Sequence, residues 1–154
     1  MDPAIEGFAA SLGFASLMVA ITVLIHFWGL IALTRVMGRT GRRLRPHESH
    51  LGQAGLLVVV VFGIFALHTV EIWLYAILYL AIGALASLEP ALYFSTVTFV
   101  ALGYGDVVLD PPWRLLSAIE AANGVILIAW STAFMFGVTA RLRALEHDWL
   151  DPDK

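Results

Sequence analysis

The sequence contains no cysteine among its 154 residues, and only 14% of them are Asp, Glu, Lys or Arg. The absence of thiols excludes disulfide bonds and thiolate metal sites. Soluble domains usually carry about a quarter charged residues, so the low charge argues against an ordinary soluble domain. The formal net charge is −3, which gives no general attraction to nucleic acid, and we expect no nucleic-acid partner.

Basic residues are missing from the first twenty positions, which contain Asp2 and Glu6. A secretory signal needs a basic segment before an apolar core of about 7–15 residues, and the apolar run here is longer. We therefore expect no typical secretory signal. No ladder of arginines at every third position crosses an apolar stretch, which argues against strong voltage sensing.

Hydrophobic residues make up 60% of the chain and gather in three long stretches. The stretches run from about Phe8 to Val36, from about Leu51 to Ser87, and from about Leu115 to Ala140. A helix needs about 20 apolar residues to cross the hydrocarbon core of a bilayer. The sequence therefore predicts an all-α membrane protein with three transmembrane helices and lipids as neighbours.

The second stretch is long enough to contain two short spans with a break near His68 and Thr69. No turn sequence occurs there, and a turn inside lipid would leave backbone groups unsatisfied. We therefore favour one long helix, bent at Gly63, over two spans.

Arginines gather after the first and third stretches, and the positive-inside rule places such clusters in the cytoplasm. Three spans then put the N-terminus outside and the C-terminus inside, in a multi-pass protein of the cell (inner) membrane. The residues behind this orientation are Arg35, Arg39, Arg42, Arg43, Arg45, Arg141 and Arg143.

A short segment between the second and third stretches is the candidate functional element. Pro90 suits the first position of a helix, and Ser87 or Glu89 can assist its start. The helix that follows has about ten residues, too few to span a bilayer, so we expect a re-entrant element.

Gly103, Tyr104 and Gly105 follow this short helix. Alternating glycines permit left-handed backbone angles, which turn successive carbonyl groups toward one side. Several copies around one axis would form rings of oxygen that replace the water shell of an ion. The negative end of the helix dipole favours a cation.

The stretch that ends in Gly103-Tyr104-Gly105-Asp106 resembles the pore loop of the potassium channel family, which ends in Thr-Val-Gly-Tyr-Gly-Asp. The resemblance runs from the second to the third helix and leaves one additional N-terminal helix. It implies a re-entrant pore helix and selectivity filter in a homotetrameric, potassium-selective pore. It also implies no enzymatic activity, and no cofactor apart from K⁺ as the permeant ion.

This resemblance divides the chain into three parts. Residues 1–50 form an N-terminal transmembrane helix with an Arg-rich cytoplasmic loop. Residues 51–144 form the pore module of outer helix, pore helix, filter and inner helix. Residues 145–154 form a short acidic tail.

The resemblance also assigns roles to individual residues. It implies K⁺ sites at Ala101, Leu102, Gly103 and Tyr104, and filter carbonyls on Ala101, Leu102, Gly103, Tyr104 and Gly105. It implies that the Tyr104 ring rests on Tyr93 or Phe94, and that Asp106 hydrogen-bonds Tyr93. The expected filter supports are Tyr93, Thr98, Asp106 and Glu120. Trp113 and Arg114 would start the inner helix at the outer interface. Gly124 is either a gating hinge or a point of close helix packing.

Three positions depart from the family pattern. Ala101 replaces the usual threonine, whose hydroxyl completes the innermost ion site, so we expect weaker ion binding and relaxed selectivity there. Leu102 replaces valine, a milder change. Val97 stands where some members have a carboxylate that pairs with the Asp106 equivalent.

Four ionisable side chains lie within the apolar stretches, where such groups are costly and are functional candidates. They are His26, His68, Glu71 and Glu120. We expect Glu120, together with Glu71 or His68, to brace the pore helix in place of the missing carboxylate at Val97. The alternatives are solvation at the interface, a His/Glu metal site and a pH response of His68.

Three other functions are compatible with these motifs. A nonselective cation channel or a non-conducting channel-like membrane protein would follow from the change at Ala101. Gly103-Tyr104-Gly105-Asp106 also fits the Gly-x-Gly-Asp pattern of intramembrane aspartyl proteases. That chemistry needs two carboxylates sharing a proton, and the other spans contain no Asp.

Overall fold

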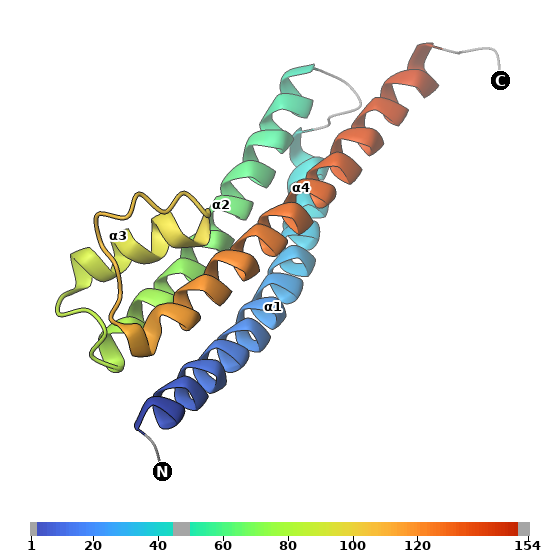
Figure 1. The fold of residues 1–154 in the computed structure, drawn as a ribbon. Coiled ribbons are helices and arrows are strands. Elements are labelled where there is room, and N and C mark those ends of the chain that lie inside the picture. The colour runs from blue at the N-terminus through green and yellow to red at the C-terminus, as the bar shows by residue number, and fades with distance from the viewer. Residues whose placement is uncertain (1–2, 45–49, 151–154) are drawn as a thin grey trace. The chain divides into compact units, whose positions relative to one another are not determined.

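The structure is a computed structural model that describes the backbone of residues 3–44 and 50–150 (Figure 1). Side chains are described for residues 7–42 and 50–143. Within these ranges the chain is mostly helical and contains no β-sheet, which confirms the predicted all-α class.

Three long helices and one short helix make up the described chain. The long helices are α1 (Pro3–Leu44), α2 (His50–Ala81) and α4 (Arg114–Leu150). The short helix α3 (Leu88–Phe99) lies between α2 and α4, and a 3₁₀ turn η1 (Pro111–Trp113) leads directly into α4.

The three long helices contain the expected membrane spans. Gly7–Arg42, His50–Ala81 and Pro111–Arg143 are each long and apolar enough to cross a bilayer. The protein is therefore a multi-pass membrane protein with three transmembrane helices.

Helix α1 extends beyond its apolar stretch, so the expected Arg-rich loop is shorter than the sequence suggests. Arg35, Arg39 and Arg42 lie on the last turns of the helix. No proline occurs between Pro3, at the start of the helix, and Pro46, and the residue before a proline is disfavoured in a helix. The side chains of Arg43 and Arg45 and the expected tail 145–154 fall outside the described side chains.

Helix α2 is continuous through His68 and Thr69, so the two-span alternative is wrong. It ends in a turn in which Gly83 has a φ of +68°, a left-handed conformation that glycine adopts without steric cost. The amide of Ala84 donates to the carbonyl of Tyr79 across this turn, and α3 begins soon after it.

The chain divides into two compact units. The first comprises Met1–His26 and His68–Ile128, and it contains α3 and the segment after it. Its core is aromatic and aliphatic, with both Tyr75 and Tyr79 completely buried. The other buried members of this core are Ala15, Met18, Phe94, Phe99, Leu109, Leu116 and Leu127.

The second unit comprises Phe27–Leu67 and Ala129–Lys154. Its core consists of Leu33, Leu56, Val60, Ile64, Val138 and Leu142. A Cβ atom at Gly63 would lie 2.5 Å from a methyl carbon of Leu33. This close approach gives Gly63 a packing role within the unit.

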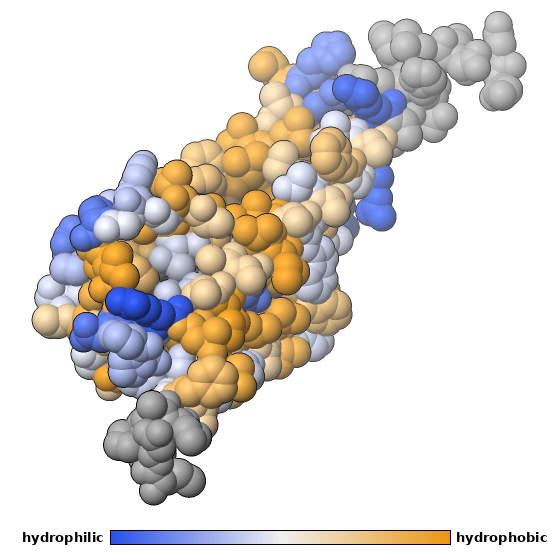
Figure 2. All heavy atoms as spheres, in the orientation of Figure 1, coloured by the Kyte–Doolittle hydropathy of each residue, from blue (hydrophilic) through white to orange (hydrophobic). Residues whose placement is uncertain are grey.

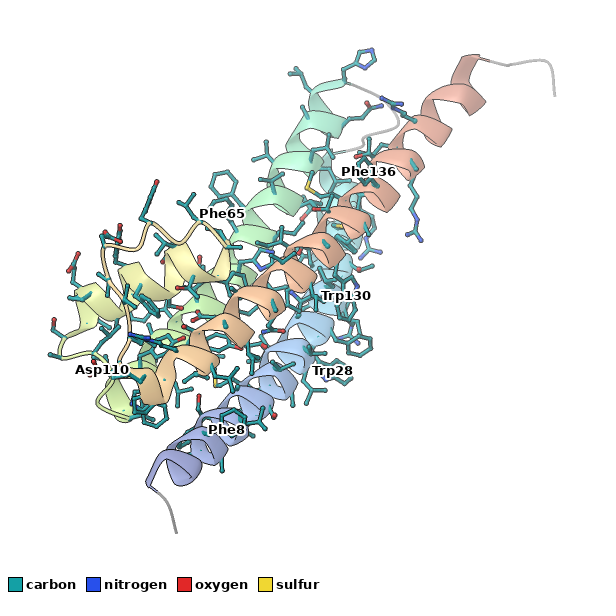
Figure 3. The ribbon with its side chains drawn as sticks, in the orientation of Figure 1. Phe8, Trp28, Phe65, Asp110, Trp130 and Phe136 are labelled. Carbon is teal, nitrogen blue, oxygen red and sulfur yellow. The ribbon has the colours of Figure 1, made fainter. Side chains whose placement is uncertain are left out.

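Large hydrophobic side chains are exposed along all three long helices. Phe65 and Phe136 are both 72% exposed, and Phe8 and Trp28 also point outward (Figure 3). Hydrophobic residues cover much of the visible helical surface in Figure 2. Lipid accepts such a surface, whereas exposed apolar patches of this kind are unusual on soluble monomers.

Candidate functional site

The candidate site begins with α3, which starts two residues before the expected position at Pro90. Ser87 is the N-cap residue, and its carbonyl accepts a hydrogen bond from the amide of Ala91 at 3.2 Å. Pro90 falls within the first turn, where a missing N–H costs nothing because the first amides of a helix have no partner within it. The short helix therefore forms as its sequence predicts.

One face of α3 is buried in the first unit. It carries Ala91, Phe94, Ser95, Val97, Thr98 and Phe99. The ring of Phe94 packs edge-to-face on Tyr79 of α2, with centroids 5.3 Å apart. This packing fixes which face of α3 turns toward α2.

The backbone after α3 takes positive φ angles at every second residue. The values are +55° at Ala101, +51° at Gly103 and +78° at Gly105. The left-handed glycines expected from the sequence are present, and Ala101 extends the alternation by one step. Residues 100–106 thus form a single strand outside any sheet, in which the alternation turns successive carbonyls toward one side, as the resemblance requires.

Two backbone hydrogen bonds tie the start of this strand to the end of α3. The amide of Ala101 donates to the carbonyl of Thr98, and the amide of Leu102 donates to the carbonyl of Val97, both at 2.8 Å. This pairing is a Schellman cap, in which a left-handed residue follows the helix. Ala101 occupies the left-handed position, and Thr98, which is buried, supports the strand through its carbonyl.

Residues 100–106 are all exposed in the single chain. The Tyr104 side chain is 67% exposed, and the ring of Phe94 contacts Tyr79. No ring contact joins Tyr104 to Tyr93 or Phe94 among the described residues, so the expected bracing is not seen within one chain. The backbone of the strand and the Tyr104 ring are therefore accessible for contact with another molecule.

Asp106 and Tyr93 form the hydrogen bond expected behind the strand. The Tyr93 hydroxyl donates to Asp106 Oδ2 at 2.6 Å. This bond holds the pKa of the Asp106 carboxyl below its usual range, and it raises the pKa of the Tyr93 hydroxyl. Both groups lie outside the three spans. The bond ties the end of the strand to the middle of α3.

Glu120 of α4 contacts α3 as expected, but with different partners. Its Oε1 accepts a hydrogen bond of 2.6 Å from Ser95 Oγ of α3, and its Oε2 accepts one from the Tyr79 hydroxyl of α2. Ser95 Oγ also lies 2.9 Å from the carbonyl oxygen of Ile72. Glu120 thus joins three helices, while Val97 is buried without a carboxylate of its own.

Gly124 packs directly against the end of α3. A Cβ atom at this position would lie 2.0 Å from the carbonyl oxygen of Phe99 and 2.8 Å from its carbonyl carbon. Only glycine fits without displacing this backbone. Of the two roles expected for Gly124, close packing is the one that the contact supports.

Asn123 links the helices of the first unit through polar contacts. Its Nδ2 donates to Thr22 Oγ1 at 2.8 Å and lies 3.2 Å from the Tyr75 hydroxyl. In η1, directly before α4, the ring of Trp113 lies 6.1 Å from that of Phe14 of α1. These contacts join α1 and α2 to the helix that follows the strand.

Comparison with known families matches residues 54–141 to a family described as ion channel. The match covers more than half of the chain and includes α3, the strand and most of α4. The protein belongs to the ion channel family. Helix α1 of the channel lies outside the matched residues. It corresponds to the additional N-terminal helix that the sequence resemblance left over.

The channel is also similar to NAD(P)H-quinone oxidoreductase subunit 3 of Prochlorococcus marinus subsp. pastoris (strain CCMP1986 / NIES-2087 / MED4). The identity is 31% over 110 residues, which cover 65% of this chain and 89% of that protein. Apolar membrane helices draw on a small set of residue types, and 60% of this chain is hydrophobic. An identity of this size between two such chains is therefore weak support for a shared function. The family match agrees with the geometry of the strand and points to a channel rather than an enzyme. No solved structure matches the channel.

A second polar cluster lies in the first unit of the channel, next to Phe99 at the end of α3. His26 Nδ1 is 2.9 Å from Glu71 Oε1, and His68 Nδ1 is 2.8 Å from Glu71 Oε2. Glu71 therefore pairs with both histidines, and the ring of His68 lies 5.6 Å from that of Phe99 on α3. Of the groups expected to brace α3, Glu120 and His68 contact it, and Glu71 acts only through His68. Sequence reasoning identified each group but did not join His26 to the other two, because 45 residues separate it from Glu71. The three side chains are the described residues whose ligand atoms could hold a metal ion.

Proposed function

We propose that four copies of this chain form a potassium-selective pore in the cell (inner) membrane. The observation that carries the proposal is the alternation of positive φ angles at Ala101, Gly103 and Gly105, directly after a helix too short to cross the bilayer. Carbonyl oxygens of Ala101, Leu102, Gly103, Tyr104 and Gly105 replace the water around K⁺, with ion sites at Ala101 to Tyr104. No cofactor is needed, and K⁺ is the permeant ion.

The tetramer follows from the geometry of a carbonyl ring. One chain supplies one strand, and cyclic symmetry closes four strands around an axis. The strand residues 100–106 are exposed in the single chain, as surfaces that meet a neighbour must be. Leu88 and Thr96 on the outer side of α3 are exposed as well. We propose that neighbouring copies cover these surfaces and enclose Tyr104.

Selectivity depends on how firmly the strand is held. Tyr93 holds Asp106 at the outer end, and the Schellman cap holds Ala101 and Leu102 at the inner end. Glu120 and Gly124 set the position of α3 between them. These supports favour potassium selectivity, whereas the missing hydroxyl at position 101 favours the alternative of a nonselective cation channel.

Reconstitution of the purified protein in planar bilayers tests the proposal. Bi-ionic reversal potentials with K⁺ on one side and Na⁺ on the other should show strong preference for K⁺. Equal permeabilities would identify a nonselective cation channel, and the absence of current would identify a non-conducting membrane protein. Current from the chain alone would also separate a channel from one subunit of an oxidoreductase.

A matched pair of glycine variants links any current to the strand. Gly103→Ala introduces a side chain at a φ of +51° and should abolish selective current. Gly13→Ala lies on α1, where a Cβ atom would meet nothing within 4 Å, and it should leave current unchanged.

A further inference from the structure

His26, His68 and Glu71 bring two imidazoles and one carboxylate together in the core of the first unit. Both His26 and Glu71 are completely buried, and the His68 side chain is 14% exposed. One ligand atom from each residue can be chosen so that all three lie within 4.8 Å of one another. His26 belongs to α1, and the other two are three residues apart on α2.

The hydrogen bonds of this cluster leave one polar atom unsatisfied. His68 Nε2 is buried and has no partner among the described residues. The ring of His68 is enclosed by the His26 ring at 5.5 Å and the Phe99 ring at 5.6 Å, measured between centroids. The hydrogen bonds of the cluster therefore leave one ring nitrogen of His68 available, which an ion or a water can occupy.

We propose that His26, His68 and Glu71 form a site for Zn²⁺. Two imidazoles and a carboxylate are a ligand set that zinc accepts, with a fourth position left for water. Zinc–ligand bonds of about 2.0–2.2 Å place neighbouring ligands of a tetrahedral site about 3.3 Å apart. The Nδ1 atoms of His26 and His68 lie 2.9 and 2.8 Å from Glu71 Oε1 and Oε2, somewhat closer than that spacing, and one ligand atom from each residue lies within 4.8 Å of the other two.

The chemistry of the cluster selects among cations. Imidazole nitrogen suits Zn²⁺, whereas Mg²⁺ and Ca²⁺ prefer oxygen ligands. The negative charge of Glu71 partly offsets that of the ion, which matters because a buried charge must be paired or coordinated. An ion here ties α1, which lies outside the matched channel region, to α2 next to Phe99 at the end of α3.

Binding of Zn²⁺ to the full-length protein in detergent tests this site independently of whether the pore conducts. After treatment with a chelator, the protein is titrated with Zn²⁺ in competition with a chromophoric chelator. We expect one Zn²⁺ per chain, no competition from millimolar Mg²⁺ or Ca²⁺, and an affinity at least about tenfold weaker in His26→Ala and in Glu71→Gln. His50→Ala, at the exposed start of α2, is the matched control and should bind as the unaltered protein does.

Two outcomes would overturn the proposal. One is a protein that retains no Zn²⁺, which would make the cluster a metal-free pairing of Glu71 with two histidines. The other is an affinity for Zn²⁺ that His26→Ala leaves unchanged, or that His50→Ala lowers as much as His26→Ala does. Because the variants can misfold, Co²⁺ is added to the unaltered protein as a second measurement. Intense visible absorption bands of a tetrahedral, nitrogen-ligated ion support the site, and weak octahedral bands contradict it.

Discussion

At the scale of single residues, the hydrogen bond from Tyr93 to Asp106 makes the outer end of the strand sensitive to pH. The bond lowers the pKa of Asp106 and raises that of Tyr93. Its stabilising contribution is therefore fully present between the ordinary values of about 4 for Asp and about 10 for Tyr. It is lost as the pH falls through the lowered pKa of Asp106, or rises through the raised pKa of Tyr93.

Tyr93→Phe should return the pKa of Asp106 toward its ordinary range, because this change removes the donor and keeps the ring. Carboxyl ¹³C NMR titration of Asp106 in detergent micelles measures the change. Tyr104→Phe is the matched control, since no hydrogen bond of its hydroxyl to Asp106 is present in the described chain. If the pKa of Asp106 is unchanged in Tyr93→Phe, a group other than the Tyr93 hydroxyl lowers it.

Gly124 is the position at which the smallest change should have the largest effect. Gly124→Ala places a carbon 2.0 Å from the carbonyl oxygen of Phe99, and that atom belongs to the backbone just before the strand. Overpacking of this kind costs about 1–3 kcal/mol or more. We expect a lower thermal unfolding temperature and altered or lost current.

Gly137→Ala lies on the same helix, where a Cβ atom would meet nothing within 4 Å, and it serves as the control. Equal stability of the two alanine variants would mean that α4 and the end of α3 are farther apart than the structure places them.

At the scale of helices and turns, the cap of α3 carries an unusual residue. Ala101 has a φ of +55° in the left-handed position of a Schellman cap, where glycine is usual. A left-handed L-residue costs about 1–2 kcal/mol, and glycine loses about 0.5–1 kcal/mol through the greater freedom of its unfolded chain. Ala101→Gly should therefore raise the free energy of unfolding by about 0.5–1 kcal/mol.

Ala122→Gly, at an exposed position of α4, should lower the free energy of unfolding by about 1 kcal/mol. Thermal unfolding of both variants in the same detergent compares them. A destabilisation of Ala101→Gly as large as that of Ala122→Gly would argue against the left-handed cap.

Glu120 determines how α3 is held between α2 and α4. Glu120→Ala leaves the buried Tyr79 hydroxyl without its acceptor, which costs about 1–3 kcal/mol, and it removes the link from α4 to Ser95, whose hydroxyl keeps only the carbonyl oxygen of Ile72 within reach. Glu120→Gln keeps an oxygen acceptor and a polar group of the same shape. We expect a large loss of thermal stability and of current in the alanine variant and near-normal behaviour in the glutamine variant. Similar losses in both would indicate that the negative charge, rather than the hydrogen bonds, holds α3.

At the scale of the whole molecule, three spans place the two ends of the chain on opposite sides of the membrane. Arginines follow the first and third spans, so we propose that the N-terminus is outside and the C-terminus is cytoplasmic. Because the chain contains no cysteine, single-cysteine variants report the side of each end without background.

An impermeant maleimide should label Ala4→Cys on intact cells and label Asp153→Cys only after the membrane is permeabilised. The unaltered cysteine-free protein is the control for nonspecific labelling. Labelling of both ends from the same side would require an even number of spans and would contradict the orientation.

Much of the channel could be predicted from local features of the sequence. The length of the apolar stretches determined the three spans, and Pro90 together with the short apolar run after it predicted α3. Gly103 and Gly105 predicted the left-handed backbone angles. Each of these features depends on neighbouring residues alone, because hydrogen bonding within a helix and the freedom of glycine are local properties.

Contacts between distant residues were decided only by the tertiary structure. The sequence left open whether Gly124 bends or packs, and it did not name Ser95 and Tyr79 as the partners of Glu120. It also did not bring His26 to Glu71. These outcomes depend on how far each helix is rotated about its axis and on how closely two helices approach. A helix that is apolar on every face has no polar face in its sequence from which either property could be predicted.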